Sequence, residues 1–160
     1  MAKSDLVTEA YGTTDEAVAT LGLARALSDD EALRQDVLVL QRELFVVGAD
    51  LAANPKERKK LDPEVSLVTS TMVERLEKRI DDLVQQRPLP EAFIVPGANP
   101  ASATLDVARS VVRRAEREVV ALERAEREVN PEIRRYLNRL SDLLFVLARW
   151  AAGESEPLSR

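Results

Sequence analysis

The chain has 160 residues, of which 45% are hydrophobic, and a formal net charge of −5. This length and apolar content predict one domain over residues 1–160, and the acidic balance argues against nucleic acid or an anionic membrane as a partner. Because cysteine and histidine are both absent, the sequence excludes a disulfide framework, a thiolate metal site, a His-containing catalytic triad and a Glu-x-x-His di-iron bundle. We therefore expect no metal ion held by protein ligands.

The first residues are polar and carry no apolar leader, and no run approaches the roughly 20 apolar residues of a membrane span. We expect a cytoplasmic protein.

Capping signals and apolar periodicity predict five helices and no convincing strand. The sequence Thr-Thr-Asp-Glu at 13–16 has the form of a capping box and predicts a first helix over 13–27. Ser-Asp-Asp-Glu at 28–31 predicts a second helix over 28–53.

The next two connections differ in character. The charged stretch 56–63 carries a cluster of like charges, which favours a solvated, mobile connector over a phosphate site. A third helix is predicted over 69–86, and the prolines at 88 and 90 end it. Segment 91–100 then contains an extended apolar tetrapeptide before a Pro-Gly turn. Its composition favours a loop that plugs the end of the bundle with Phe93 and Ile94.

The last two helices are predicted over 101–128 and 130–152. Asn130 and Pro131 are typical of a helix start, and Gly153 is typical of a helix end. Each helix has an apolar seam at spacings of three and four residues. In the fourth helix the seam consists of Leu105, Ala108, Val112, Ala115, Val119 and Leu122, and in the fifth of Ile133, Leu137, Leu140, Leu144, Leu147 and Ala151.

Polar side chains border these seams. Arg109, Arg113 and Glu116 lie beside the fourth seam, and Asn138 and Ser141 lie beside the fifth. An arginine at the edge of a packed surface keeps its charge and needs a carboxylate, a phosphate or a neighbouring subunit. Two readings stay open. The arginines bind an anionic ligand, or acidic residues such as Asp15, Glu116 and Asp142 neutralise them in an internal network.

Four motifs occur in order along the chain. They are Tyr-Gly-Thr-Thr-Asp-Glu at 11–16, Phe-Ile-Val-Pro-Gly at 93–97, Ala-Arg-Ser-Val-Val-Arg-Arg-Ala-Glu-Arg at 108–117 and Tyr-Leu-Asn-Arg-Leu-Ser-Asp-Leu-Leu-Phe at 136–145. In order and spacing they resemble the all-helical ATP:cob(I)alamin adenosyltransferases. The last two motifs are the most specific of the four.

The resemblance implies an all-α five-helix bundle that forms a homotrimer, with ATP and cobalamin bound in clefts between subunits. It implies transfer of the 5′-deoxyadenosyl group of ATP to the cobalt of cob(I)alamin, giving adenosylcobalamin and triphosphate, with Mg²⁺ accompanying ATP. A reductase and an adenosylcobalamin-dependent mutase are the further partners that it suggests. A different class of function remains as the alternative, namely a catalytically impaired member that binds a corrinoid or serves as an assembly module.

The resemblance also assigns nucleotide contacts. Arg113 would hold ATP and its phosphates together with Arg114, Glu116 and Arg117, and Asn138 would be a second nucleotide contact. Lys3 would be a phosphate contact. A guanidinium suits a leaving triphosphate because it presents paired donors and keeps its proton.

The corrinoid contacts follow from the same resemblance. Asp15 and Arg109 are similar to the pair that forms an intersubunit salt bridge beside the corrinoid, and with Arg113 they form the catalytic set. Phe93 is similar to the aromatic residue that occupies the lower face of the corrin. The family's glycine-rich ATP segment at the N-terminus has no match, so we expect residues 1–160 alone to bind ATP weakly.

Overall fold

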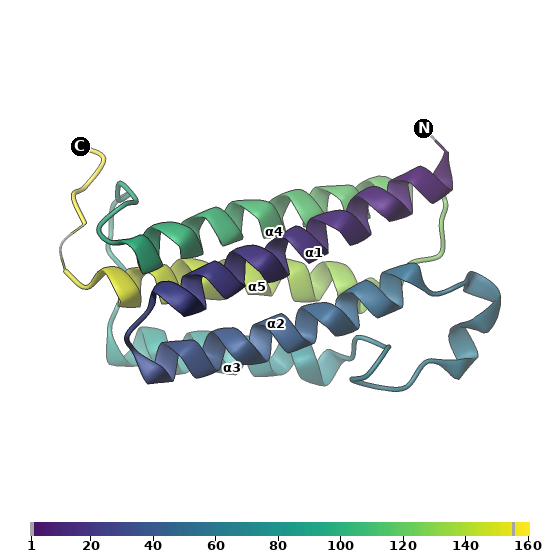
Figure 1. Cartoon of the computed structure of the whole chain (residues 1–160), viewed down its shortest axis with the longest axis horizontal. Helices are drawn as coiled ribbons and strands as arrows, with labels where there is room; N and C mark the ends of the chain where they lie inside the picture. The colour runs from purple at the N-terminus through teal and green to yellow at the C-terminus, as the bar shows by residue number, and fades with distance from the viewer. Residues whose placement is uncertain (1, 155) are drawn as a thin grey trace.

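The computed structural model describes residues 2–154 and 156–160, which form an all-helical bundle of long helices lying roughly side by side (Figure 1). The elements are α1 (Lys3–Leu27), α2 (Glu31–Ala52), the 3₁₀ helix η1 (Pro55–Lys60), α3 (Ser70–Gln86), α4 (Pro100–Arg124) and α5 (Pro131–Ala152). Extended pairing in the described residues is limited to two isolated bridges. The prediction of an all-α fold is confirmed.

Helix α1 starts ten residues earlier than the capping-box prediction, which was wrong. Thr13 and Thr14 lie inside the helix, and their hydroxyls contact the preceding turn, where Thr14 Oγ1 donates to the carbonyl oxygen of Tyr11 at 2.6 Å. Thr13 Oγ1 lies 2.9 Å from the carbonyl oxygen of Glu9 and 2.7 Å from Glu118 Oε2 on α4. A threonine hydroxyl satisfied in this way is compatible with a helix interior, so the pattern Thr-Thr-Asp-Glu is not a start signal here.

Helix α5 begins and ends where the sequence predicted. Asn130 caps its first turn by accepting from the Glu132 amide, Pro131 occupies the first position, and Gly153 follows the last turn with φ of 71°. Helix α4 ends at Arg124 instead of residue 128. The chain turns there because Glu126 adopts φ of 60°, in the left-handed region that interrupts a helix.

The core forms where α4 packs against α1 and α5, while α1 also packs on α2 and α3 on α5. Both predicted seams lie in this core. All six residues of the α4 seam are fully buried. In the α5 seam five of the six residues are at most 2% exposed, and the sixth, Ala151, is half-buried. The apolar periodicity therefore predicted the packed faces of these helices correctly.

Polar bridges join α2 to α3, which have little direct backbone contact. Arg79 Nη2 lies 2.6 Å from Asp36 Oδ2, and Arg75 Nη2 lies 3.1 Å from Glu43 Oε2. The buried Tyr136 of α5 donates its hydroxyl to Glu43 Oε1 at 3.0 Å. Burial raises the pKa of the Tyr136 phenol well above its ordinary value, so this hydroxyl remains a donor.

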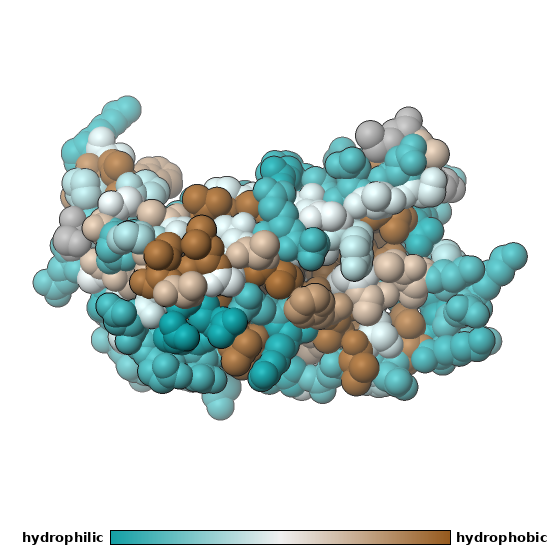
Figure 2. Space-filling view, viewed as in Figure 1, coloured by the Kyte–Doolittle hydropathy of each residue, from teal (hydrophilic) through white to brown (hydrophobic). Residues whose placement is uncertain are grey.

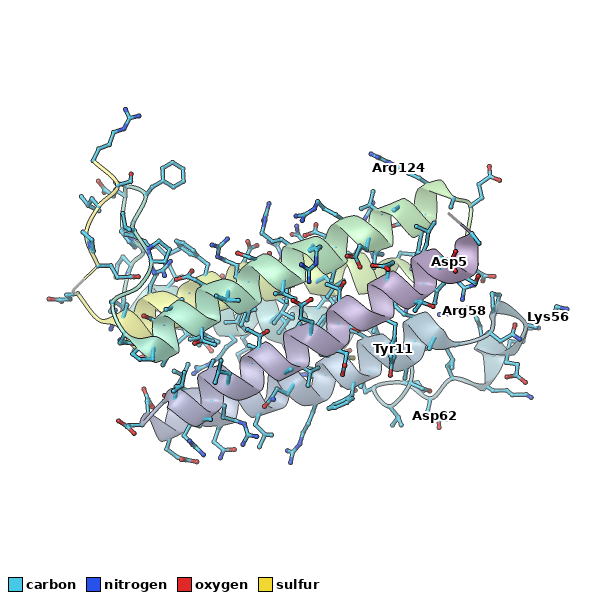
Figure 3. The ribbon with its side chains drawn as sticks, turned by 45° about the horizontal axis from the view of Figure 1, so that its top comes forward. Asp5, Tyr11, Lys56, Arg58, Asp62 and Arg124 are labelled. Carbon is cyan, nitrogen blue, oxygen red and sulfur yellow. The ribbon has the colours of Figure 1, made fainter. Side chains whose placement is uncertain are left out.

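The connection after α2 differs in part from its prediction. Its lysines are exposed, as expected for a solvated segment, but Arg58 lies against the end of α2 (Figure 3). There Arg58 Nη2 lies 2.6 Å from Oδ1 of Asp50, which is 1% exposed. Asp50 Oδ2 also accepts from the Val68 amide at 2.9 Å and from Asn130 Nδ2 at 2.8 Å. We call these four residues the Asp50 cluster; it ties both ends of the connection to the bundle.

The prediction that Phe93 plugs the bundle end was wrong. Its side chain is 87% exposed, although Ile94 is half-buried. The backbone of this loop instead pairs with the C-terminal residues, where Ile94 forms an isolated bridge with Leu158. The loop is therefore held by backbone pairing with the C-terminal residues and not by burial of the aromatic ring. No helix in residues 2–154 or 156–160 is both long enough and apolar enough to cross a membrane.

Candidate active site

The arginines of α4 fall into two groups. Arg113 and Arg117 are exposed, and neither has a hydrogen-bond or ion-pair partner in the described part of the chain. Arg114 is paired within the chain, because its guanidinium contacts Glu16 of α1 and lies 3.7 Å from Glu118 Oε1. Of the two readings of these arginines, internal neutralisation therefore applies to Arg114, whereas Arg113 and Arg117 are available to an outside anion.

We call the exposed side of α4 that carries Arg113 and Arg117 the arginine face. Beside it, Asn138 and Glu116 join α5 to α4. Asn138 Nδ2 donates to Glu116 Oε1 at 3.0 Å. Both residues line a pocket of about 370 Å³, which we call the arginine pocket. Its other lining residues are Val73, Glu77, Arg134, Arg135 and Arg139. Two of the predicted nucleotide residues are thus brought together in a concave and mainly charged site.

Three arginines of this pocket were missed at the level of sequence. Arg139 lies 3.3 Å from both Glu77 Oε1 and Asp142 Oδ2, and the hydrogen bond that Arg139 donates to Glu77 is the main cause that raises the pKa of Arg139. Arg134 and Arg135 have carboxylate neighbours as well. The available signal was the spacing of Arg135 and Arg139, which are four positions apart and so share one face of α5, with Arg134 directly before them.

A second pocket, of about 410 Å³, lies at the end of the bundle that carries Phe93. We call it the Phe93 pocket. It is lined by Pro90, Glu91, Ala92, Phe93, Ile94, Pro96, Asp106, Arg109, Phe145 and Arg149. The structure therefore brings the predicted corrinoid residues Phe93 and Arg109 to one site. Phe93 lies in the loop before α4, and Arg109 lies in the first half of α4.

Charge in the Phe93 pocket is balanced through Asp106. Arg109 Nε lies 3.4 Å from Asp106 Oδ1, and Arg149 Nη2 lies 2.5 Å from Asp106 Oδ2. The Arg149 guanidinium also lies over the Phe145 ring, 4.6 Å from its centroid. Sequence reasoning gave no role to Asp106 or Arg149. An arginine at 149 within the apolar run of α5 was the signal, because a charge there needs a buried partner.

Asp15 lies elsewhere, in a hollow of about 310 Å³ between α1 and α2. The neighbouring Tyr11 (labelled in Figure 3) packs against α2 where Gly48 leaves room for its ring; a Cβ there would lie 3.2 Å from Tyr11 Cε2. Asp15 is exposed, and within the described chain no ion pair joins it to Arg109. The predicted pair is therefore not formed within the described chain, and its formation between subunits stays a prediction.

The remaining predicted contact is Lys3. This residue begins α1, and its side chain lies outside the described residues. Taken together, the site consists of an arginine face on which Arg113 and Arg117 have no partner among the described residues, the Phe93 pocket, and a mainly apolar hollow that Asp15 borders. Such a surface can bind a polyanion and position a bulky apolar ligand, and it supplies no histidine or cysteine nucleophile.

Comparison with known proteins finds one family. The family model described as cobalamin adenosyltransferase matches residues 1–151. A corrinoid adenosyltransferase of Citrobacter freundii is 43% identical over 148 residues, which span 92% of this chain and 81% of that protein. One from Mycobacterium leprae (strain TN) is 40% identical over 164 aligned residues, covering 100% of this chain and 85% of the relative.

Solved structures show the same fold with ligands bound. A variant of the PduO-type ATP:corrinoid adenosyltransferase from Lactobacillus reuteri, complexed with cobalamin and ATP, matches with a TM-score of 0.87 at 32% identity and covers 100% of this chain and 89% of that chain. A second variant of that protein, complexed with ATP, matches with a TM-score of 0.86 at 32% identity and covers 100% and 90%.

Proposed function

The chain belongs to the cobalamin adenosyltransferase family, and we infer that it transfers the 5′-deoxyadenosyl group of ATP to the cobalt of a reduced corrinoid. The cobalt(I) electron pair attacks the ribose C5′ of ATP, the cobalt–carbon bond forms, and the C5′–oxygen bond breaks to release triphosphate. The nucleophile belongs to the corrinoid. The absence of histidine and cysteine from the sequence is therefore no obstacle to catalysis.

What the protein must supply is position and charge. It has to hold C5′ in line with cobalt, balance the negative charge on the departing triphosphate and keep water away. We propose that Arg113 and Arg117 meet the phosphates, because their guanidinium groups have no partner in residues that the structure describes. This observation carries the proposal, since an unpaired arginine face beside a pocket is suited to a polyanion.

Asn138 and Glu116 would contact the nucleoside part of ATP, because they form one wall of the arginine pocket. Arg114 would act less directly through its pairing with Glu16 and Glu118. Among the described residues there is no group of three or more acidic side chains that could hold a cation. Mg²⁺ would therefore arrive with the ATP phosphates, where it would offset part of their charge.

The corrinoid would occupy the Phe93 pocket. An aromatic side chain that is 87% exposed at a pocket mouth is costly in water, and contact with a corrin face would bury it. Arg109 lies on the same pocket with 29% of its side chain exposed. It can therefore contact an amide of the corrin or an acidic residue of another subunit.

Assembly as a homotrimer would complete the site. Figure 2 shows apolar side chains gathered on the face formed by α1 and α2, and the exposed large apolar residues on these helices are Tyr11, Leu23, Leu27, Val39 and Phe45. Such a patch favours a protein interface. In this arrangement Asp15 of one subunit would pair with Arg109 of the next.

We place the reaction in the cytoplasm, with a reductase supplying cob(I)alamin and a mutase receiving the product.

The direct test is to incubate the protein with chemically reduced cobalamin and Mg-ATP under anaerobic conditions. We expect the visible spectrum of cob(I)alamin to be replaced by that of adenosylcobalamin, with one triphosphate released per product. Corrinoid binding without product would instead support an impaired member that serves as a binding or assembly module. No spectral change at all would contradict both.

A further inference from the structure

The C-terminal residues pair with the loop that carries Phe93. The Val95 amide donates to the carbonyl oxygen of Pro157 at 2.8 Å, and the Ser159 amide donates to the carbonyl oxygen of Phe93 at 2.8 Å. Both segments lie at the same end of the molecule in Figure 1, where the yellow chain end stands beside the teal loop that precedes α4. The backbone on each side of the Ile94–Leu158 bridge is thereby fixed.

A buried ionic cluster fastens the C-terminal residues to the bundle. Arg149 Nε lies 2.6 Å from Glu156 Oε1, while its Nη2 lies 2.5 Å from Asp106 Oδ2. The three side chains are only 5–6% exposed. Buried charges need charged partners, so the low exposure of these side chains means that the arrangement is strongly specified. Arg149 therefore joins α5, α4 and the chain end in one cluster.

This cluster also forms part of the Phe93 pocket. Asp106 contacts Arg109, and the Arg149 guanidinium stacks on Phe145, so each of these residues lines the cavity that Phe93 borders. Meanwhile Glu156 lies one residue before Pro157, which accepts from the loop. A single guanidinium thus links the wall of the pocket to the segment that holds its aromatic residue.

We propose that Arg149 is a positioning residue for the corrinoid step. Through Glu156 it holds residues 156–160 against the Phe93 loop, and this pairing fixes the direction in which Phe93 meets the corrin. The effect of Arg149 on catalysis rests on the proposed function. The link from Arg149 through Glu156 to the Phe93 loop rests on the structure alone.

The end of α5 has contacts of its own besides this link. Helix α5 already ends at Gly153, and Arg87 Nη2 donates to the carbonyl oxygen of Arg149 at 2.8 Å, so the helix end keeps its own partner. In Glu156→Gln, Arg149 retains Asp106 as its counter-charge. The matched control is Glu154→Gln, which makes the same change at an exposed residue that has no side-chain partner in the part of the chain described.

The first experiment is hydrogen exchange on the ligand-free protein. In Glu156→Gln we expect the amides of Val95 and Ser159 to exchange about tenfold faster than in the wild type, because local opening becomes easier. In Glu154→Gln their exchange should be unchanged. Unaltered protection of Val95 in Glu156→Gln would overturn the proposal, and this result does not depend on whether the protein is an adenosyltransferase.

The second experiment is steady-state kinetics with the same two variants. Glu156→Gln should raise the KM for cob(I)alamin about tenfold while the KM for ATP stays at the control value, since only the corrinoid side is displaced. Equal KM values in the two variants would overturn the positioning role even if hydrogen exchange has changed. Absence of product from the wild type would refute the proposed function and leave the exchange result standing.

Discussion

The arginine face of α4 and the Asp50 cluster use the same side chain in opposite ways. In the Asp50 cluster, Arg58 pairs with the Asp50 carboxylate, which is 1% exposed and accepts two further hydrogen bonds, from the Val68 amide and from Asn130. On α4, Arg113 and Arg117 have no partner within residues 2–154 and 156–160. The first region has its charge balanced inside the chain. The second leaves positive charge for something outside it.

In this bundle, the residues that stabilise the fold differ from those proposed to bind ligands. A balanced buried cluster contributes to folding, and its disruption leaves a charge without solvent or partner. An unpaired exposed arginine contributes little to folding, and its guanidinium is free to bind an anion, which is the role proposed for Arg113 and Arg117. Substitutions in the two regions should therefore affect different measurements.

The largest expected effect is on stability, from Asp50→Ala. Loss of this carboxylate leaves the Arg58 guanidinium without its counter-charge and the Val68 amide without its acceptor, while Asn130 Nδ2 keeps only the carbonyl oxygen of Val68. We expect the free energy of unfolding to fall by about 3–5 kcal/mol. Urea denaturation followed by circular dichroism measures it. The control is Asp81→Ala, an exposed carboxylate on α3 with no ion-pair partner in the described chain, which should stay within about 0.5 kcal/mol.

Arg113→Ala should produce the opposite pattern. We expect kcat to fall about 10²–10³-fold, as for loss of a donor to developing charge, with stability changed by less than about 0.5 kcal/mol. Arg124→Ala is the matched control, because Arg124 is an exposed arginine near the end of the same helix (Figure 3), and its kcat should equal that of the wild type. A large loss of stability in Arg113→Ala would favour the internal-network reading of this arginine.

Asp15→Ala tests the intersubunit pair proposed for Asp15, which borders the hollow between α1 and α2. If Asp15 pairs with Arg109 of another subunit, the substitution should weaken assembly about tenfold, because one charge at the interface loses its partner. Analytical ultracentrifugation over a concentration series measures the association. Glu9→Ala, another exposed acid on α1, serves as the comparison, and an unaltered association constant in Asp15→Ala would count against the intersubunit pair.

Arg114→Ala should have the smallest effect. Its ion pairs with Glu16 and Glu118 are partly exposed, with 44% of the arginine side chain accessible, and such pairs contribute about 0–1 kcal/mol. We expect a loss of stability in that range and a kcat within about threefold of the wild type. A drop as large as that of Arg113→Ala would place Arg114 directly on the nucleotide and remove the distinction between the two arginines.

Much of the fold and part of the site could be predicted from residue order. The seam of α4 and the caps of α5 are local properties, because helix periodicity and the preferences of Asn130, Pro131 and Gly153 act within a few residues. The start of α1 could not be predicted in this way. Thr13 is satisfied by Glu118, which lies 105 positions away.

The order of residues is enough to predict that the chain forms long helices, which faces of α4 and α5 are buried, and which motifs carry arginine and aromatic side chains. Which arginines are neutralised depends on the packing of the helices, since Arg114 and Arg149 meet carboxylates from distant positions while Arg113 meets none among the described residues. The exposure of Phe93 and the pairing of its loop with residues 157–159 are likewise visible only in the folded chain. Periodicity is set by the backbone of one helix, whereas the balance of charge depends on which helices become neighbours.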